Sequence, residues 1–163
     1  MIAILYNIRS LHNIGSMFRT SDAVGVEKIY LCGYTSAPVD ENGIVRGQVG
    51  KTALGAEHSV PWEKCKSTTA LLDRLHRNGY KIYAVEIDPR STPYQKIKLT
   101  PRGWKKAALV MGSEVLGLTP GILKRADKIL EIPMHGMKES LNVSVAFGVV
   151  TYGLHMNSGD RQR

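Results

Sequence analysis

The chain has 163 residues, of which 43% are hydrophobic, and it carries two cysteines and a formal net charge of +8. This length suits one domain of ordinary size, and the hydrophobic fraction is too high for a disordered chain. No uninterrupted apolar run reaches the roughly 18 residues that a membrane-spanning helix needs. The start lacks the basic segment of a signal peptide, so a cytoplasmic protein without membrane contact is expected.

The net charge indicates a class of binding partner, and the two cysteines bear on whether the chain has a disulfide or a metal site. The sequence pI of about 9.6 favours a polyanionic partner, although a generally basic surface would give the same value. Cys32 and Cys65 form no C-x-x-C pair and have no histidine cluster near them, so neither a disulfide nor a metal site is predicted.

Short apolar runs alternate with helical patterns along the chain. Strands are predicted over 2–6, 28–32, 81–87, 107–111 and 128–132, where β-branched and aromatic residues are frequent. Helices are predicted over 14–23 with Asn13 as N-cap, over 68–77 after the N-cap Ser67, over 121–126 after Thr119 and Pro120, and over 141–156. This alternation predicts an α/β domain over 1–157, with a mainly parallel sheet flanked by helices, before a short polar tail at 158–163.

Residues 34–63 are rich in glycine, proline and polar residues, which predicts a long loop with a short helical piece. The segment 47–52 approaches a phosphate-binding loop, but Val45 stands where that pattern requires glycine, so no nucleotide hydrolysis is predicted. Basic residues in this loop and in a second turn-rich stretch predict a folded binding face; they are Arg46, Lys51, Lys96, Lys98, Arg102, Lys105 and Lys106.

The first of three unusual runs is Asn13-Ile14-Gly15-Ser16-Met17-Phe18-Arg19. Six residues of helix turn through about 600°, which leaves Asn13 and Arg19 roughly 240° apart. The two side chains therefore cannot share a helix face. Helix capping alone would account for Asn13, and a solvated surface position would account for Arg19.

The second run, 112–118, follows the predicted strand 107–111. Gly112 ends the strand without a side chain, which lets a ligand approach the backbone, and Glu114 follows. Ligands of parallel α/β sheets bind at the carboxyl ends of the strands, so this loop is a candidate site. The alternative is an ordinary connection with a solvated glutamate.

The third run begins with Ile132-Pro133-Met134 and continues at 140–146 with Ser-Leu-Asn-Val-Ser-Val-Ala. Either Ser140 or Asn142 would be a good N-cap for the last helix. That helix is apolar on nearly all sides, which predicts that it is buried.

In this order, the three runs resemble the motifs of the SpoU/TrmH-type RNA ribose 2′-O-methyltransferases of the SPOUT class, over about residues 7–152. The resemblance implies a C-terminal deep trefoil knot, which nothing in the periodicity indicates. It also implies S-adenosyl-L-methionine as methyl donor, tRNA or rRNA as substrate, and a homodimer that buries part of the last helix. Since the first motif begins at the start of the chain, no separate RNA-binding domain is expected.

The resemblance also assigns residues. The implied cofactor contacts are Val85, Gly112, Ile132, Met134 and Leu141. The implied catalytic set is Asn13, Arg19, Glu114, Ser140 and Asn142. A base role for an arginine is physically difficult because its pKa exceeds 12, so a guanidinium that binds phosphate and stabilises developing charge is favoured. Two alternatives stay open: a SPOUT-type base methyltransferase, and an inactive RNA-binding member of the fold.

Overall fold

The computed structural model describes residues 1–113 and 115–159. Within them the chain forms one seven-stranded sheet in which every paired strand is parallel. The strands lie in the order β3-β2-β1-β6-β4-β7-β5, and the α/β class with a mainly parallel sheet is confirmed. Their bounds are β1 (Ile2–Tyr6), β2 (Lys28–Cys32), β3 (Trp62–Cys65), β4 (Lys81–Val85), β5 (Thr92–Pro93), β6 (Ala107–Met111) and β7 (Lys128–Glu131).

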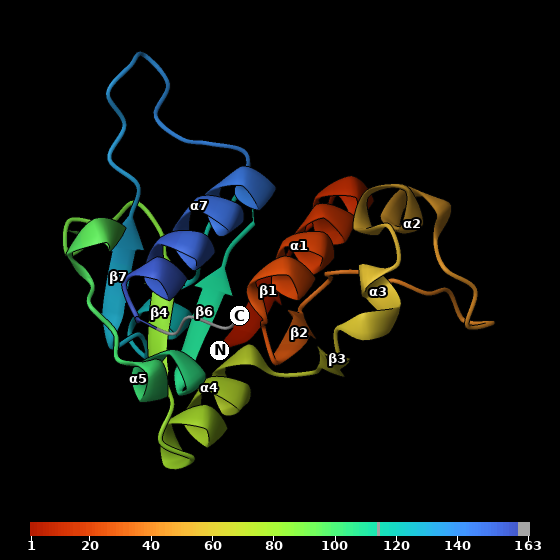
Figure 1. Cartoon of the computed structure of the whole chain (residues 1–163), viewed down its shortest axis with the longest axis horizontal. Coiled ribbons are helices and arrows are strands. Elements are labelled where there is room, and N and C mark those ends of the chain that lie inside the picture. Colours follow the sequence, from red (N-terminus) through yellow and green to blue (C-terminus); the bar gives the residue numbers. More distant parts are fainter. Residues whose placement is uncertain (114, 160–163) are drawn as a thin grey trace.

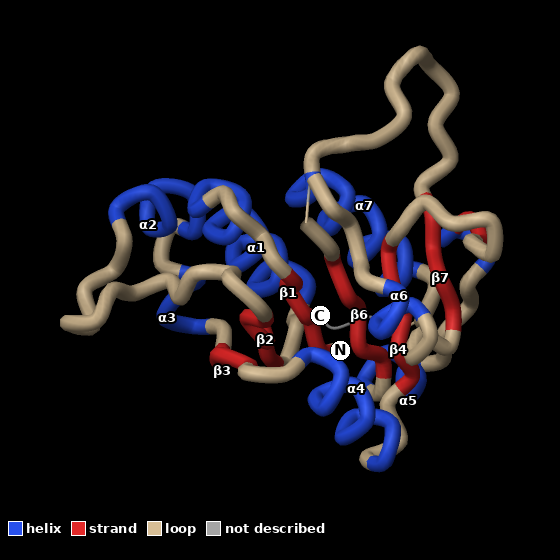
Figure 2. Tube along the Cα trace, turned by 180° about the vertical axis from the view of Figure 1, so that it is seen from behind, coloured by secondary structure: helices blue, strands red, loops and turns tan. Residues whose placement is uncertain are grey.

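Helices cover both faces of the sheet (Figures 1 and 2). One face packs against α1 (Leu11–Val24), α2 (Gly47–Ala53), α3 (Ala56–Ser59), α5 (Pro101–Lys105) and α7 (Val143–Met156). The other packs against α4 (Thr68–Arg77) and α6 (Pro120–Leu123), while the short 3-10 helix η1 (Tyr94–Lys96) follows β5. Successive residues of β1 alternate between the two cores, with Ala3 in one and Ile4 in the other.

The helix starts agree with the predicted capping at two sites and differ at a third. Ser67 caps α4 by accepting a hydrogen bond from Ala70 N, and Thr119 occupies the N-cap position of α6. Asn13, predicted as the N-cap of the first helix, lies inside α1 instead. The helix begins three residues earlier because the hydroxyl of Ser10 accepts from Asn13 N.

The region 34–63, predicted as a loop with one short helical piece, holds two helices and the start of strand β3. The segment that resembles a phosphate loop is α2, whose Val49 and Ala53 are buried. Gly15 of α1 has no room for a side chain, because a Cβ there would overlap Val49 O and the Thr52 hydroxyl. This close contact fixes α2 against α1.

Strands β3 and β5 were not predicted. β3 is an edge strand whose Glu63 and Lys64 are exposed, so it lacks the continuous apolar run of a central strand, and β5 has only two residues. β4 ends at Val85 and β7 ends at Glu131, so both strands are shorter than the predicted strands 81–87 and 128–132. Across residues 1–113 and 115–159, no helix combines the length and apolar character needed to cross a membrane.

Candidate functional site

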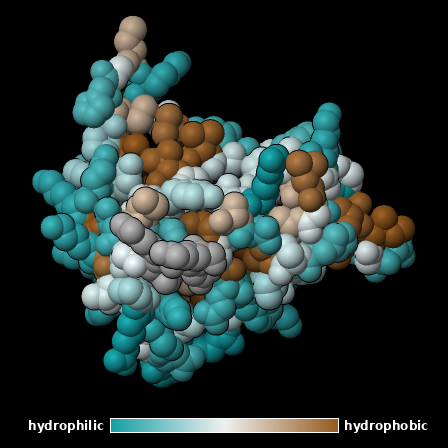
Figure 3. All heavy atoms as spheres, viewed as in Figure 1, coloured by the Kyte–Doolittle hydropathy of each residue, from teal (hydrophilic) through white to brown (hydrophobic). Residues whose placement is uncertain are grey.

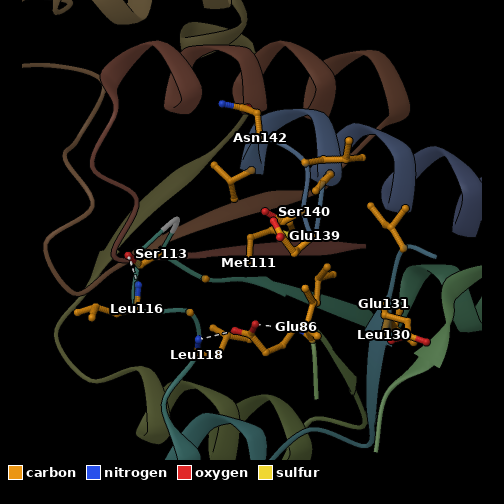
Figure 4. A pocket seen from close by; sticks show the side chains of 18 of the residues that line it. Glu86, Met111, Ser113, Leu116, Leu118, Leu130, Glu131, Glu139, Ser140 and Asn142 are labelled. Atoms are coloured by element: carbon orange, nitrogen blue, oxygen red, sulfur yellow. Dashed lines mark hydrogen bonds between the residues drawn. The ribbon is translucent and has the colours of Figure 1, made fainter. Parts of the chain in front are cut away.

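The loops that follow β4, β6 and β7 meet at the carboxyl edge of the sheet, beside the start of α7 (Figure 1). Together they enclose an open cavity of about 780 Å³ (Figure 4). Its walls combine the apolar ends of the three strands with glutamates and polar backbone from the loops. This edge is where open parallel sheets bind their ligands.

The cavity brings together residues that lie far apart in the sequence. All of the predicted cofactor contacts line it: Val85, Gly112, Ile132, Met134 and Leu141. From the predicted catalytic set, Ser140 and Asn142 line it as well. Glu114 lies outside the described residues.

The loop after β6 is tightly folded by its own hydrogen bonds. The Ser113 hydroxyl accepts from the backbone N–H groups of Val115 at 3.2 Å and Leu116 at 3.3 Å. A Cβ on Gly112 would lie only 2.9 Å from Gly117 C and from Leu118 Cγ. A side chain at position 112 would therefore displace the loop after β6. Gly112 itself lines the cavity, and Val115 and Leu116, which also line it, are exposed.

Glu86 is a site residue that the sequence prediction missed. It follows β4 and lines the cavity, and its carboxylate accepts hydrogen bonds from Leu118 N at 2.7 Å and Ile87 N at 3.0 Å (Figure 4). Gly117, with φ of +62°, lies against the same carboxylate and has no room for a Cβ. Glu86 thus joins the loop after β4 to the loop after β6. The sequence feature that could have identified Glu86 is an acidic residue directly after an apolar strand.

Asn142 caps α7, which is one of the two capping positions predicted for this helix. Its Oδ1 accepts from Ser144 N at 2.9 Å and from the Ser144 hydroxyl at 2.7 Å. Its Nδ2 donates to Asn13 Oδ1 at 3.2 Å. The first and third sequence runs therefore touch at the edge of the cavity.

Arg19 does not line this cavity. Its exposed side chain borders a second hollow of about 570 Å³, formed by α1 and the 53–59 segment. Asp22 and Ser59, also in that hollow, are joined by a hydrogen bond of 2.5 Å. Arg19 and Asn13 thus lie apart on the same helix, as the helical geometry predicts.

The predicted basic face is divided between two parts of the molecule. Lys51 belongs to α2 and Arg46 precedes it, and α2 packs on α1. Lys105 lies on α5, which precedes β6 and so lies toward the amino edge, opposite the cavity (Figure 1). All the basic residues predicted for this face are exposed.

Two further features bear on the chemistry of the edge. Arg90 donates two hydrogen bonds to Asp88 in the loop after β4, and they hold the pKa of that carboxyl well below its usual range. Among residues 1–113 and 115–159, no group of three or more histidine, cysteine or acidic side chains is arranged to hold a metal ion.

Comparison with known proteins places the chain among RNA methyltransferases by sequence and fold. The model of the SpoU rRNA Methylase family matches residues 1–152. A tRNA (guanosine(18)-2′-O)-methyltransferase from Aquifex aeolicus is 34% identical over 93% of this chain and 67% of its own length. A 23S rRNA (guanosine-2′-O-)-methyltransferase from Coxiella burnetii is 33% identical over 93% of this chain and 56% of its own length.

A solved structure of an AdoMet-bound rRNA methyltransferase from Sinorhizobium meliloti shares the fold, with a TM-score of 0.81. The match covers 95% of this chain and 55% of that chain at 24% identity. Since the family model spans nearly the whole sequence, the chain belongs to the SpoU rRNA methylase family.

Proposed function

We propose that this protein transfers a methyl group from S-adenosylmethionine to a ribose 2′-hydroxyl of a tRNA or an rRNA. The observation that carries the proposal is the meeting of the whole predicted cofactor set in one cavity at the carboxyl edge of the sheet. Three separate segments supply this set. Membership of the SpoU family, whose relatives named above methylate ribose in tRNA and 23S rRNA, supports the same reaction.

The cavity lining suits an adenine ring that carries a polar tail. Val85, Ile132 and Leu141 offer apolar surface to the faces of a flat ring. The backbone at Gly112, which lines the cavity, offers hydrogen-bonding groups. Glu139 at the cavity adds an acceptor for hydroxyl or ammonium groups. When bound, the methyl donor supplies a methyl group activated by an adjacent sulfonium.

The residues of the chain then position the attacking hydroxyl. Arg19 binds the target phosphate and stabilises the charge that develops on the ribose oxygen, since a guanidinium remains protonated and pairs well with phosphate. A base role through a neighbouring phosphate is the alternative. Glu114 orients Arg19 or a nearby donor, Ser140 and Asn142 orient the nucleotide, and Asn13 holds the first loop.

We also propose that the protein works as a homodimer. Arg19 lies outside the cofactor cavity of its own chain, so a second copy is needed to bring an arginine to the methyl group. An exposed apolar stripe on and beside α7 supports this, and apolar atoms gather over the start of that helix in Figure 3. The stripe comprises Leu141, Val145, Tyr152 and Met156, which recur at helical spacing.

A methylation assay tests the reaction. Purified protein is incubated with labelled S-adenosylmethionine and with transcripts of tRNA or 23S rRNA, and the RNA is digested to nucleosides for mass spectrometry. A 2′-O-methylnucleoside is expected. A base-methylated product would favour the base methyltransferase, and RNA binding without any product would favour the inactive RNA-binding protein.

We further propose the trefoil knot of the SPOUT class for the C-terminal part, and a cytoplasmic location. Membership of the SpoU family supports the knot, and the RNA substrates of the relatives support the location. An experimental chain trace that closes without a knot would contradict the first. Recovery of the protein outside the cytosolic fraction would contradict the second.

A further inference from the structure

Tyr34 is an aromatic residue left half-exposed at the carboxyl edge of the sheet. It lies two residues beyond β2, and 50% of its surface is accessible. By contrast, Tyr30 of β2 and Tyr83 of β4 are each 8% exposed. Leaving a large ring in water at a functional edge forgoes the stabilisation that burial would give.

Several hydrogen bonds hold the segment around this ring. Tyr34 N donates to Asn7 Oδ1 at 3.1 Å, and the phenol hydroxyl donates to the Ser113 hydroxyl at 3.4 Å. The ammonium of Lys64 donates to the carbonyl oxygens of Gly33, at 3.4 Å, and Thr35. The ring is therefore both exposed and ordered before any ligand binds, which reduces the entropy cost of a contact to it.

The backbone conformation next to the ring supports the same conclusion. Asn7, directly after β1, has a φ of +57°, in the left-handed region that asparagine enters more readily than most residues other than glycine. Gly33 has a φ of +60°, and a Cβ there would overlap the Asn7 amide. Together these two conformations bring the Asn7 side chain to Tyr34 N and fix the backbone that carries the ring.

The position of Tyr34 relates it to the proposed reaction. Its hydroxyl donates to Ser113 in the loop after β6, and β6 lies beside β1 at the place where the sheet order changes direction. Ser113 lies next to Gly112 and to the predicted catalytic residue Glu114. The cofactor cavity is lined from β4, β6, β7 and α7, with no described residue of β1 or β2, so Tyr34 lies on the other side of the loop after β6.

We propose that Tyr34 is a stacking platform for a nucleobase of the RNA substrate, beside the nucleotide that is methylated. The inference rests on the proposed function. An aromatic ring stacks on any base, and the positive charge of Lys64 beneath the segment favours the adjoining phosphates. An RNA strand held there reaches the loop after β6 from the side that the cofactor leaves free.

Steady-state kinetics with a substrate RNA and direct binding of S-adenosylmethionine test this inference. Tyr34→Ala should raise the KM for RNA about tenfold, which corresponds to about 1.4 kcal/mol, and should leave the cofactor Kd unchanged. Tyr34→Trp, which keeps a stacking ring, should restore a KM within about threefold of the wild type. Ile44→Ala, which trims another exposed apolar side chain, is the control and should change neither quantity.

The outcomes separate this inference from the proposed function. If the wild type methylates RNA and Tyr34→Ala keeps the wild-type KM, or if Tyr34→Trp is as impaired as Tyr34→Ala, stacking is wrong and the methyltransferase proposal stands. Equal weakening of RNA and cofactor binding by Tyr34→Ala would indicate a merely structural role for Tyr34 and would also overturn the stacking inference. A wild type that methylates no RNA would overturn the proposed function itself.

Discussion

Asn142 donates a hydrogen bond from Nδ2 to Asn13 Oδ1 at 3.2 Å, across a sequence separation of 129 residues. The Oδ1 of the same amide caps α7 by accepting from Ser144. One side chain thus starts the last helix and joins it to α1. Both sets of hydrogen bonds fix the start of α7, at the rim of the cavity, next to the first sequence run.

Variants of Asn142 can separate these two functions. Asn142→Ala removes cap and link, so the free energy of unfolding should fall by about 1 kcal/mol and methyl transfer should drop. Asn142→Asp keeps a capping oxygen but loses the donor, so stability should be largely retained while turnover falls. Denaturation and methylation assays measure the two effects.

The matched control is Ser67→Ala, which removes the N-cap of α4 on the opposite face of the sheet. It should lower stability by a similar amount without a specific loss of turnover. An Asn142→Asp variant with full activity would show that the link to Asn13 is dispensable.

Gly112→Val should abolish cofactor binding. Even a Cβ at this position would lie 2.9 Å from Gly117 C, so the larger side chain must displace the loop after β6. Calorimetry of the wild type should give micromolar affinity for S-adenosylmethionine, about −8 kcal/mol. Gly47→Ala, where a Cβ meets nothing within 4 Å, is the control. Normal binding by Gly112→Val would remove the loop from the site.

Glu86 should act as a positioning residue for the cofactor loops. Glu86→Ala leaves the N–H of Leu118 without its acceptor, and affinity for S-adenosylmethionine should fall about tenfold. Glu86→Gln keeps an acceptor oxygen and should lie within about threefold of the wild type. Glu41→Ala, at an exposed acid before α2, serves as control. If Glu86→Gln and Glu86→Ala weaken cofactor binding equally, the negative charge of Glu86 is required and a hydrogen-bond acceptor alone is not sufficient.

Arg19→Ala should retain cofactor binding and lose most methyl transfer. Arg19 lies outside the cofactor cavity, so affinity for S-adenosylmethionine is expected to be unchanged. Removal of one charge-stabilising group lowers turnover by about 10²–10³-fold. Arg77→Ala, in the last turn of α4, is the control. Turnover near the wild-type level would mean that another residue stabilises the developing charge.

A charge in the apolar stripe on α7 should disrupt the dimer. Tyr152 is 44% exposed, so Tyr152→Glu should be tolerated by the fold and should yield monomers with poor activity. Sedimentation measures the assembly, circular dichroism checks folding, and Ile44→Glu is the control. A wild-type protein that is an active monomer at nanomolar concentration would refute the dimer and leave ribose methylation intact.

The central strands and the main helices could be predicted from local pattern. Buried parallel strands such as β1, β2 and β6 read as short apolar runs, and Ser67 and Asn142 carry capping side chains. The edge strand β3 and the helices of residues 34–63 lack such signals. Their formation depends on neighbours, as the contact of Gly15 with α2 illustrates.

For the candidate site, the three sequence runs determined the expected residues apart from Val85, and the family that they resemble, because residue type and spacing are local properties. Only the tertiary structure decided that Val85, Gly112 and Leu141 share one cavity while Arg19 faces another hollow. It also decided that the Glu86 carboxylate accepts a hydrogen bond from Leu118 N and that the Tyr34 hydroxyl donates one to Ser113. These relationships follow from strand order and loop packing, and neither is encoded in the spacing of residues along the chain.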